Sequence, residues 1–436
     1  MNTSPLQHKT LDTGVSQVEE PTLVPHDVAG ARGKGNIRLL VFTSLYPNTA
    51  QPRHGVFVEE RLRHLVDSGR VTATVVAPVP WFPSRNPCFG RYSVFARVPA
   101  REVRYGIEIV HPRYPVIPKV GMNVAAKLMC RAMLPLLRKH LTCMHDFDLV
   151  DAHYFYPDGA TAARLAQVMG KPVVISARGS DVNDLPNYRR PREQIQSAAQ
   201  NADAIITVSR MLKSKLAALD VDPDKITVLR NGVDLDRFAP RDRNHIRREL
   251  RLSGPVWLTV GHLVERKGVY IAVEALARVP DTTLLIAGDG PNERRLHDLV
   301  ERLGLSARVR FLGPVRHDEL CRYYNAADAL IHASASEGMP NVVLESLACG
   351  TPVVAAPYDG VEELLDTPES GEVATLRSVE AIASAWQRLL ERAPSRAATR
   401  KHGEKLGWAS VINQQCALYA RVMDACADTG QRKAQS

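Results

Sequence analysis

Two glutamates eight positions apart, Glu337 and Glu345, frame the segment with the clearest chemistry. The first lies in a loop after the apolar run 329–334, and the second lies on a helix predicted to begin near Pro340. Proline suits the first helical position, where its missing N–H would have no partner anyway. The free N–H groups of that turn suit a bound phosphate, and flanking carboxylates can hold hydroxyl groups. This is the chemistry needed to hold a sugar nucleotide.

A lysine, Lys267, lies on a short turn that ends at Gly268 and follows the apolar run 256–260. An ammonium group in that position can neutralise a leaving diphosphate. His262 and Arg266 lie in the same turn, and a neutral imidazole contacts phosphate more weakly than a guanidinium and can titrate. The alternative for a lysine considered alone is an exposed loop residue without a chemical role.

Apolar runs alternate with amphipathic stretches from residue 37 onward, which predicts parallel sheets built from βαβ units. The predicted strands are 37–42, 72–77, 149–153, 172–176, 204–208 and 226–229, followed by 256–260, 282–287, 309–312, 329–332 and 352–356. Neither set has a G-x-G-x-x-G motif after its first strand, which argues against a nicotinamide enzyme. Two such sets indicate two lobes with a ligand cleft at the carboxyl ends of their strands.

The composition indicates a globular protein of two domains. The chain has 436 residues, of which 45% are hydrophobic and 24% charged, and its formal net charge is +9. The excess of positive charge is compatible with a well-solvated surface, an anionic donor nucleotide or an anionic membrane. Since no nucleic-acid-binding motif accompanies it, we expect no nucleic-acid partner. The 7 cysteines form no C-x-x-C pair, and no apolar run reaches the roughly 20 residues of a membrane span. We therefore expect a cytoplasmic protein.

Taken together, the motifs closely resemble the Glu-x7-Glu signature and accompanying turns of retaining glycosyltransferases of family 4, the group 1 class. The resemblance covers about residues 37–425, and its further motifs are 231–234 with Phe238, 260–268, 287–291 and 311–313. It implies an α/β fold with two Rossmann-like lobes facing across a cleft, the GT-B architecture. It also implies an acceptor-side lobe at 37–245 and a nucleotide-sugar lobe at 246–404. Residues 1–36 are polar and have no periodicity, which by itself predicts a disordered tail. Within 405–436, a helix at 406–425 would return to the first lobe.

The resemblance assigns the donor half of the cleft to the second lobe. The residues that it places at the donor are His262, Arg266, Lys267, Gly290, Val315, Gly338, Met339, Pro340, Asn341 and Glu345. Glu345 would accept hydrogen bonds from the ribose, and Glu337 would contact the transferred sugar. Gly338 would let the backbone approach the diphosphate because it has no Cβ. The family usually has an arginine at the position of His262. Arg266 is a candidate to supply the phosphate contact that this arginine would make.

In the first lobe, His153 matches the active-site histidine of the family, so His153, Lys267 and Glu337 are the predicted catalytic residues. The residues predicted on the acceptor side are Tyr46, Gly55, Arg178 and Asp181. Many relatives have histidine at the position of Arg178, which leaves its role open. Asp181 would either hold an acceptor hydroxyl or cap a helix.

No metal ion or other cofactor is expected. The sequence Asp234-Leu235-Asp236 looks like a metal-binding D-x-D motif, but it belongs to a turn and we interpret it as structural. With no carboxylate nucleophile evident, front-face displacement is the preferred mechanism. The alternatives are a sugar-nucleotide epimerase or glycogen-type synthase of the same fold, and a non-catalytic partner subunit with a degenerate site.

A narrower resemblance links the regions 46–60 and 112–114 to bacterial cell-surface polysaccharide enzymes, including the teichuronic acid type. A glycan or lipid-linked acceptor would follow. The stretch 120–144 is apolar, with interspersed basic residues at Lys127, Arg131, Arg138 and Lys139. Pro135 should kink the helix predicted there or divide it in two. This helix either packs on its own lobe or rests a basic face on anionic lipid.

Overall fold

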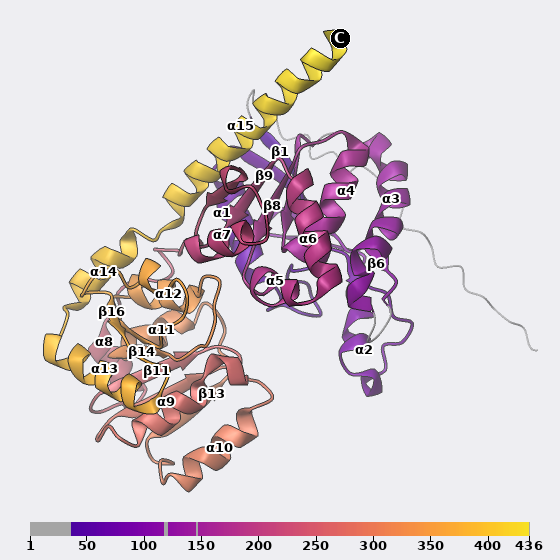
Figure 1. Ribbon diagram of the computed structural model, residues 1–436. Helices are drawn as coiled ribbons and strands as arrows, with labels where there is room; N and C mark the ends of the chain where they lie inside the picture. Colours follow the sequence, from indigo (N-terminus) through magenta and orange to yellow (C-terminus); the bar gives the residue numbers. More distant parts are fainter. Residues whose placement is uncertain (1–35, 117–120, 145–146, 436) are drawn as a thin grey trace, which may run out of the picture.

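The computed structural model describes residues 36–116, 121–144 and 147–435, and Figure 1 shows two lobes. Within these residues the first lobe holds an eight-stranded sheet, ordered β10-β9-β8-β7-β1-β2-β5-β4. Its strands are β1 (Ile37–Phe42), β2 (Val71–Val76), β4 (Arg101–Arg104), β5 (Ile107–Val110), β7 (Leu149–His153), β8 (Val173–Ala177), β9 (Ala204–Thr207) and β10 (Ile226–Val228). A separate two-stranded ladder joins β3 (Val79–Pro80) to β6 (Arg113–Tyr114).

The second lobe holds a six-stranded parallel sheet in the described part of the chain, ordered β13-β12-β11-β14-β15-β16. Its strands are β11 (Val256–Val260), β12 (Thr283–Ala287), β13 (Val309–Gly313), β14 (Ala329–His332), β15 (Val353–Ala355) and β16 (Gly371–Val373). Every strand predicted from the apolar runs is present, and its ends agree within about one residue.

Helices cover both sheets and follow the strands in alternation. Those of the first lobe are α1 (Val56–Asp67), α2 (Arg91–Phe95), α3 (Ala125–Met144), α4 (Ala160–Met169), α5 (Ser180–Asn183), α6 (Arg189–Asn201) and α7 (Arg210–Ala217). The later helices are α8 (Arg243–Glu249), α9 (Val269–Leu276), α10 (Glu293–Arg302), α11 (Leu320–Ala326), α12 (Asn341–Ala348), α13 (Val379–Arg392), α14 (Arg396–Glu404) and α15 (Trp408–Gln435). Short turns of helix are η1 (Pro87–Phe89), η2 (Gly121–Asn123), η3 (Phe155–Gly159), η4 (Leu185–Asn187), η5 (Pro223–Lys225), η6 (Glu265–Lys267) and η7 (Val361–Glu363).

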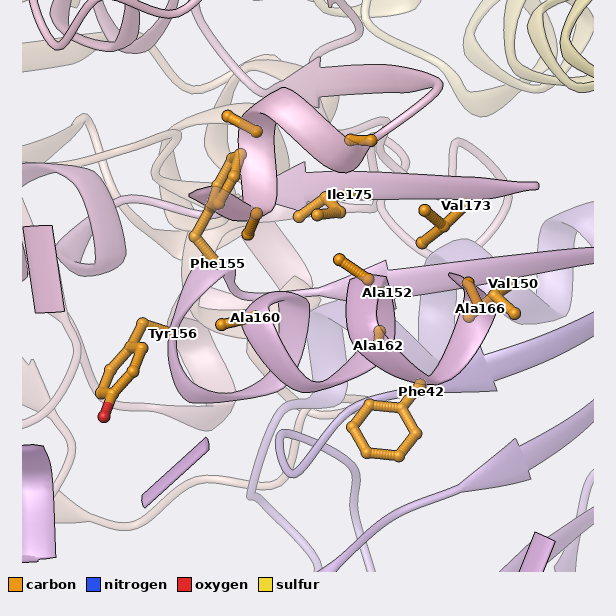
Figure 2. Packing of buried hydrophobic residues seen from close by; sticks show 14 of the residues in the cluster. Phe42, Val150, Ala152, Phe155, Tyr156, Ala160, Ala162, Ala166, Val173 and Ile175 are labelled. Carbon is orange, nitrogen blue, oxygen red and sulfur yellow. The ribbon is translucent and has the colours of Figure 1, made fainter. Parts of the chain in front are cut away.

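The central strands are buried on both faces, as their apolar sequences require. All five residues of β7 and all five of β8 are buried. Parallel strands covered by helices on both sides form such continuous apolar runs. Figure 2 shows part of this core, in which Val150 of β7 and Ile175 of β8 lie with Ala162 and Ala166 of α4 in one cluster.

The hairpin β4–β5 was not predicted, and it adds an antiparallel edge to the parallel sheet. Its turn, Tyr105-Gly106, has φ of 51° and 77°, the conformation of a tight hairpin turn. β4 reads Arg-Glu-Val-Arg and none of its residues is buried, so it has no apolar run for sequence analysis to detect.

The last helix, α15, returns to the first lobe, as the resemblance implied. It runs from the second lobe along the first in Figure 1, and Ile412 and Tyr419 pack in the same core cluster as Leu39 and Val41 of β1. The predicted lobe boundary at 245/246 lies inside α8, and Arg247 of that helix pairs with Asp328 beside β14. The structure therefore places α8 with the second lobe.

The helix around Pro135 is not divided, contrary to one form of the prediction. α3 is a single helix with Pro135 inside it. Ala126, Met129 and Met133 form a buried face in the core of the lobe, and this packing holds the helix together across the missing hydrogen bond. No helix in the described segments is long and apolar enough to cross a bilayer. The predicted tail, apart from Asn36, lies outside the described residues.

Candidate active site

Lys267 and Glu337 form a close ion pair, with Nζ 2.6 Å from Oε1. The turn η6 carries Lys267, and Gly268 follows it with φ of +65°. A Cβ at Gly268 would lie 2.1 Å from the carbonyl oxygen of Ala333, so only glycine allows this turn to pack on the end of β14. That packing brings the lysine to the loop that holds Glu337.

The surroundings of Glu337 favour its charged form. Burial opposes ionisation, but the charge of Lys267, the effect of His332 and the hydrogen bonds from Lys267 and Ser334 together outweigh burial and lower the pKa of Glu337 below its usual value. His332 Nε2 lies 3.6 Å from Glu337 Oε1, and burial lowers the pKa of His332 to about 4, so that ring is neutral near pH 7. Arg266 donates to the carbonyl oxygen of Ser336 at 2.5 Å and lies 3.9 Å from Glu337 Oε2.

Glu345 is buried on α12 and both of its oxygens have partners. Tyr324 Oη donates to Oε2 at 2.7 Å, and His317 Nε2 lies 2.9 Å from Oε1. The other ring nitrogen of His317, Nδ1, lies 3.2 Å from Glu60 Oε1 on α1 of the first lobe. Burial lowers the pKa of His317, but the two carboxylates outweigh it and raise the pKa to about 10. Sequence analysis missed His317, whose one signal is its place two residues after Val315 in the same strand-end loop.

A cleft of about 1010 Å³ opens between the lobes. The first-lobe loop 50–54 forms one wall, and the second-lobe turns 260–262 and 287–291, together with 314–315, form the other. His262, Gly290 and Val315, three of the residues predicted to bind the donor, line this cleft. Arg53 and Asp289 join the walls through an ion pair of 2.8 Å. His262 Nδ1 lies 2.6 Å from the carbonyl oxygen of Asp289, and its side chain is exposed.

Gly290 has a structural reason to be glycine. A Cβ there would lie 2.6 Å from the backbone nitrogen and oxygen of Leu263. The two turns of this wall are in backbone contact, so a side chain would separate them.

The start of α12 differs in one detail from the prediction. Pro340 has an extended backbone, with φ of −78° and ψ of 106°, and caps the helix, while Asn341 is the first helical residue. Met339 packs, partly buried, against the cores of both lobes. A Cβ at Gly338 would lie 2.3 Å from the carbonyl oxygen of Arg178. The absence of a side chain at Gly338 thus lets the two lobes touch, a reason that the sequence did not show.

His153 and Arg178 lie side by side at the carboxyl end of the first-lobe sheet. Arg178 Nη2 donates to His153 Nδ1, and Asp151 Oδ2 lies 3.2 Å from His153 Nε2. Burial lowers the pKa of His153, and the charge of Arg178 lowers it further against the opposing effect of Asp151.

Tyr46 and Gly55 were predicted on the acceptor side, but Tyr46 packs in the core and Gly55 packs against backbone. Tyr46 is 1% exposed and its side chain packs in the core under β1, so the prediction that it lines the acceptor side is wrong for its side chain. Its ring is apolar enough to be drawn into the core with Val58 and Leu62 of α1. Gly55 caps α1 with φ of +71°, and a Cβ there would lie 2.3 Å from the carbonyl oxygen of Leu45.

Asp181 accepts hydrogen bonds from three backbone N–H groups, those of Phe155, Arg178 and Gly179, at 2.7–3.0 Å. Burial raises the pKa of Asp181, although these bonds oppose that rise. Asp181 does not cap α5, whose N-cap is Gly179 and which has no side-chain cap; its hydrogen bonds instead hold the turn after β8.

The D-x-D sequence is a turn, as predicted. Asp234 Oδ1 accepts from the N–H groups of Asp236 and Arg237 at 3.2 and 3.0 Å. In the described ranges, no three His, Cys, Asp or Glu side chains are grouped as metal ligands.

Two family models match consecutive parts of the chain. The model of "Glycosyltransferase Family 4" matches residues 54–237, and that of "Glycosyl transferases group 1" matches residues 241–406. The chain belongs to the group 1 glycosyltransferases of family 4. It is therefore a glycosyl-transferring enzyme (EC 2.4), in agreement with the prediction.

Curated relatives are similar over much of this glycosyltransferase. The putative teichuronic acid biosynthesis glycosyltransferase TuaC of Bacillus subtilis is 29% identical over 339 residues, which cover 75% of this chain and 83% of the relative. A D-inositol 3-phosphate glycosyltransferase of Mycobacterium sp. (strain KMS) is 34% identical over 239 residues. That second match covers 52% of this chain and 54% of the relative, about half the length of each.

Solved structures confirm the predicted fold. Sucrose-phosphate synthase from Thermosynechococcus elongatus has a TM-score of 0.73 at 21% identity, with 89% of this chain and all of that chain covered. Anabaena HepE in complex with UDP has a TM-score of 0.68 at 20% identity, with 88% of this chain and all of that chain covered. The glycosyltransferase thus has the two-lobed GT-B architecture.

Proposed function

We propose that this enzyme is a retaining glycosyltransferase that needs no metal ion and moves a sugar from a nucleotide-sugar donor to a glycan or lipid-linked acceptor in bacterial polysaccharide biosynthesis. The observation that carries the proposal is the 2.6 Å pair of Lys267 and Glu337 beside the start of α12. A cation and a carboxylate meet there, just before a helix whose first-turn N–H groups are free, and Gly261 and His262, which precede Lys267 in the same loop, line the interlobe cleft.

Lys267 and the first turn of α12 would stabilise the negative charge that builds on the diphosphate as the anomeric bond breaks. In the absence of donor, Glu337 neutralises the lysine. A bound diphosphate would compete for Lys267 and free Glu337 to accept hydrogen bonds from the transferred sugar. The pair would therefore exchange partners when the donor binds.

Retention would follow from front-face displacement. The bond from the anomeric carbon to the phosphate oxygen breaks, and the bond to the acceptor oxygen forms on the same face of the sugar. The acceptor's proton passes to an oxygen of the leaving phosphate, so the step needs no carboxylate nucleophile.

The names of the similar proteins suggest the first substrates to test. HepE structures contain UDP, and one contains UDP-glucose, so UDP-glucose is our first donor. TuaC is named for teichuronic acid biosynthesis, which supports a cell-surface glycan or its lipid-linked precursor as acceptor. We propose that the enzyme works in the cytoplasm, at or near the inner face of the membrane.

The test is the release of nucleoside diphosphate from a panel of donors, with and without glycan and lipid-linked acceptors. Release that depends on the acceptor, with the donor's anomeric configuration kept in the product by proton NMR, supports the proposal. Inversion of that configuration, or conversion of the donor to an epimer without an acceptor, contradicts it.

A further inference from the structure

A buried polar network links the active-site histidine to α15, the helix that returns from the second lobe. Asp151 accepts from Tyr419 Oη at 2.8 Å, and Tyr419 Oη in turn accepts from Gln415 Nε2. Asp151, His153, Tyr419 and Gln415 are each at most 1% exposed. Tyr419 lies 268 positions after Asp151 in the chain, so only the fold brings them together.

The direction of each hydrogen bond follows from the groups themselves. A guanidinium is only a donor, so His153 Nδ1, which contacts Arg178 Nη2, must be an acceptor without a proton. The proton of the neutral ring is then on Nε2, 3.2 Å from a carboxylate oxygen of Asp151. Both ring nitrogens of His153 are thereby engaged, and the ring has one tautomer that satisfies both neighbours.

The network continues from Arg178 into the second lobe. Arg178 Nη1 donates to Asn231 Oδ1 at 3.3 Å, and Asn231 Nδ2 donates to Asn341 Oδ1 at 2.8 Å. Asn341 is the first residue of α12, where the donor diphosphate is proposed to bind. The guanidinium of Arg178 also lies over the ring of Phe57, which limits its movement.

Groups of both charges surround the imidazole of His153. Asp151 of β7 and Asp181 of α5 face the cations Arg61 of α1 and Arg178, and Tyr419 adds its hydroxyl from α15. Burial lowers the pKa of His153, in keeping with a single ring proton at physiological pH.

We propose that Asp151 and Tyr419 are positioning residues: they keep His153 in its Nε2–H tautomer, so that Nδ1 anchors the guanidinium of Arg178. The returning helix α15 thereby affects the rate of sugar transfer without contacting the substrate. His153 acts in this arrangement through Arg178, whose place at the lobe contact depends on the ring's bare nitrogen.

The tautomer can be observed without substrate. We would label histidine with ¹⁵N, identify the His153 ring by its loss in His153→Gln, and read the two ring nitrogens at pH 7.5. The wild type should carry its proton on Nε2. In Asp151→Asn the side-chain amide can donate to Nε2, so a measurable share of the rings should carry the proton on Nδ1 and lose the hydrogen bond from Arg178. A wild-type ring with the proton on Nδ1, or with both nitrogens protonated, would overturn the proposal.

A second variant, Tyr419→Phe, keeps the size of the ring and removes only the hydroxyl. It leaves Asp151 with one donor fewer, so the ring of His153 should hold its proton more strongly and titrate at a higher pH than in the wild type. An unchanged titration would count against a link from α15 to the histidine. If Asp151→Asn fails to fold, the titration of Tyr419→Phe still tests the proposal.

The kinetic arm rests on the proposed transfer reaction, whereas the NMR arm does not, so the two can fail separately. Tyr419→Phe should lower kcat about tenfold, the scale of one hydrogen bond to a charged group, because a ring that is protonated more readily loses the bare Nδ1 that holds Arg178. The Kd for UDP in calorimetry should be unchanged. Asp151→Asn should lower kcat on the order of 100-fold, because it favours the wrong tautomer.

The matched control is Ile412→Val, which removes one methylene from the same buried contact of α15 with the first lobe. It should leave kcat unchanged. If it lowers kcat as much as Tyr419→Phe, or if Tyr419→Phe keeps full kcat, the helix acts only by packing and the proposal is wrong.

Discussion

His317 of the second lobe holds Glu345 of the same lobe and also reaches the first lobe: its Nε2 lies 2.9 Å from Glu345 Oε1, and its Nδ1 lies 3.2 Å from Glu60 Oε1. Glu60 belongs to α1 of the first lobe and Glu345 to α12 of the second. The imidazole therefore joins carboxylates of the two lobes, and Arg237 Nη1 also lies 2.9 Å from Glu60 Oε1 and 3.1 Å from His317 Nδ1. The residue predicted to hold the ribose is in this way tied to the opposite lobe.

The first prediction is that His317 stabilises the fold in a pH-dependent way. The folded pKa is raised from 6.5 to about 10, so the stabilisation is complete below pH 6.5 and is lost as the pH rises toward 10. His317→Gln should lower the free energy of unfolding by about 1–3 kcal/mol at pH 6, and by less at pH 10. Denaturant unfolding at several pH values measures this difference. The control is the same substitution at the exposed His245. If the free energy of unfolding differs between His317→Gln and the wild type by the same amount at every pH, the mechanism is contradicted.

The second prediction concerns the donor. Glu345→Ala should weaken binding of the donor nucleotide, because the ribose hydroxyls lose a charged acceptor worth about 1.5–3 kcal/mol. Tyr324 and His317 also lose their partner, so circular dichroism must first show that the variant is folded. Calorimetry measures the affinity, with the exposed Glu362→Ala as control. Unchanged affinity in a folded variant would remove Glu345 from the donor site.

The third prediction concerns Lys267, the proposed partner of the leaving diphosphate. Lys267→Met should lower kcat by roughly 10²–10³-fold, the usual cost of removing a group that stabilises transition-state charge. The same change should raise the pKa of Glu337, since the lysine is the main charge that lowers it. Initial rates measure the first effect, and Lys401→Met on the surface of α14 is the control. Near-normal turnover would mean that another group neutralises the diphosphate.

The fourth prediction concerns metal ions. If Lys267 and the N–H groups of α12 carry the charge of the diphosphate, turnover should continue in excess EDTA. The measurement compares initial rates before and after chelation, then after addition of Mn²⁺ or Mg²⁺. Loss of activity that either ion restores would show that the proposed site is incomplete.

The fifth prediction concerns the membrane. Lys127 and Arg131 are exposed on α3, whereas Met129 and Met133 of the same helix are buried. The buried face shows that the helix packs on its own lobe, and the exposed bases remain free to rest on anionic lipid. Each basic side chain near such a surface contributes roughly 1 kcal/mol to the free energy of membrane binding, so binding should be weak and reversible.

Sedimentation with vesicles tests this association. Binding should require anionic lipid, weaken with salt, and fall when Lys127, Arg131, Arg138 and Lys139 are changed to Gln. The last two side chains lie outside the described part of the structure. If the wild type ignores anionic vesicles at low salt, a soluble acceptor is favoured.

Much of this protein could be predicted from local patterns. Runs such as 149–153 and 256–260 are apolar along their whole length, and a buried parallel strand can be recognised from its own residues alone. The motif around Glu337 and Glu345 was equally visible, because one loop and one helix turn contain it. The edge strand β4 was missed for the same reason, since its polar residues carry no burial signal.

The amino-acid sequence by itself determined the two-sheet architecture, the strand positions, the family and the motifs that contain Lys267 and Glu337, because these depend on neighbours along the chain. The contact between Lys267 and Glu337, 70 positions apart, came from the fold. Only the tertiary structure decided which distant groups meet. It placed Tyr46 in the core, Gly338 against the backbone of Arg178, and Tyr419 on Asp151. Such contacts depend on how the lobes and the last helix pack, and a hydrogen bond between residues 268 positions apart leaves no periodic trace in the chain.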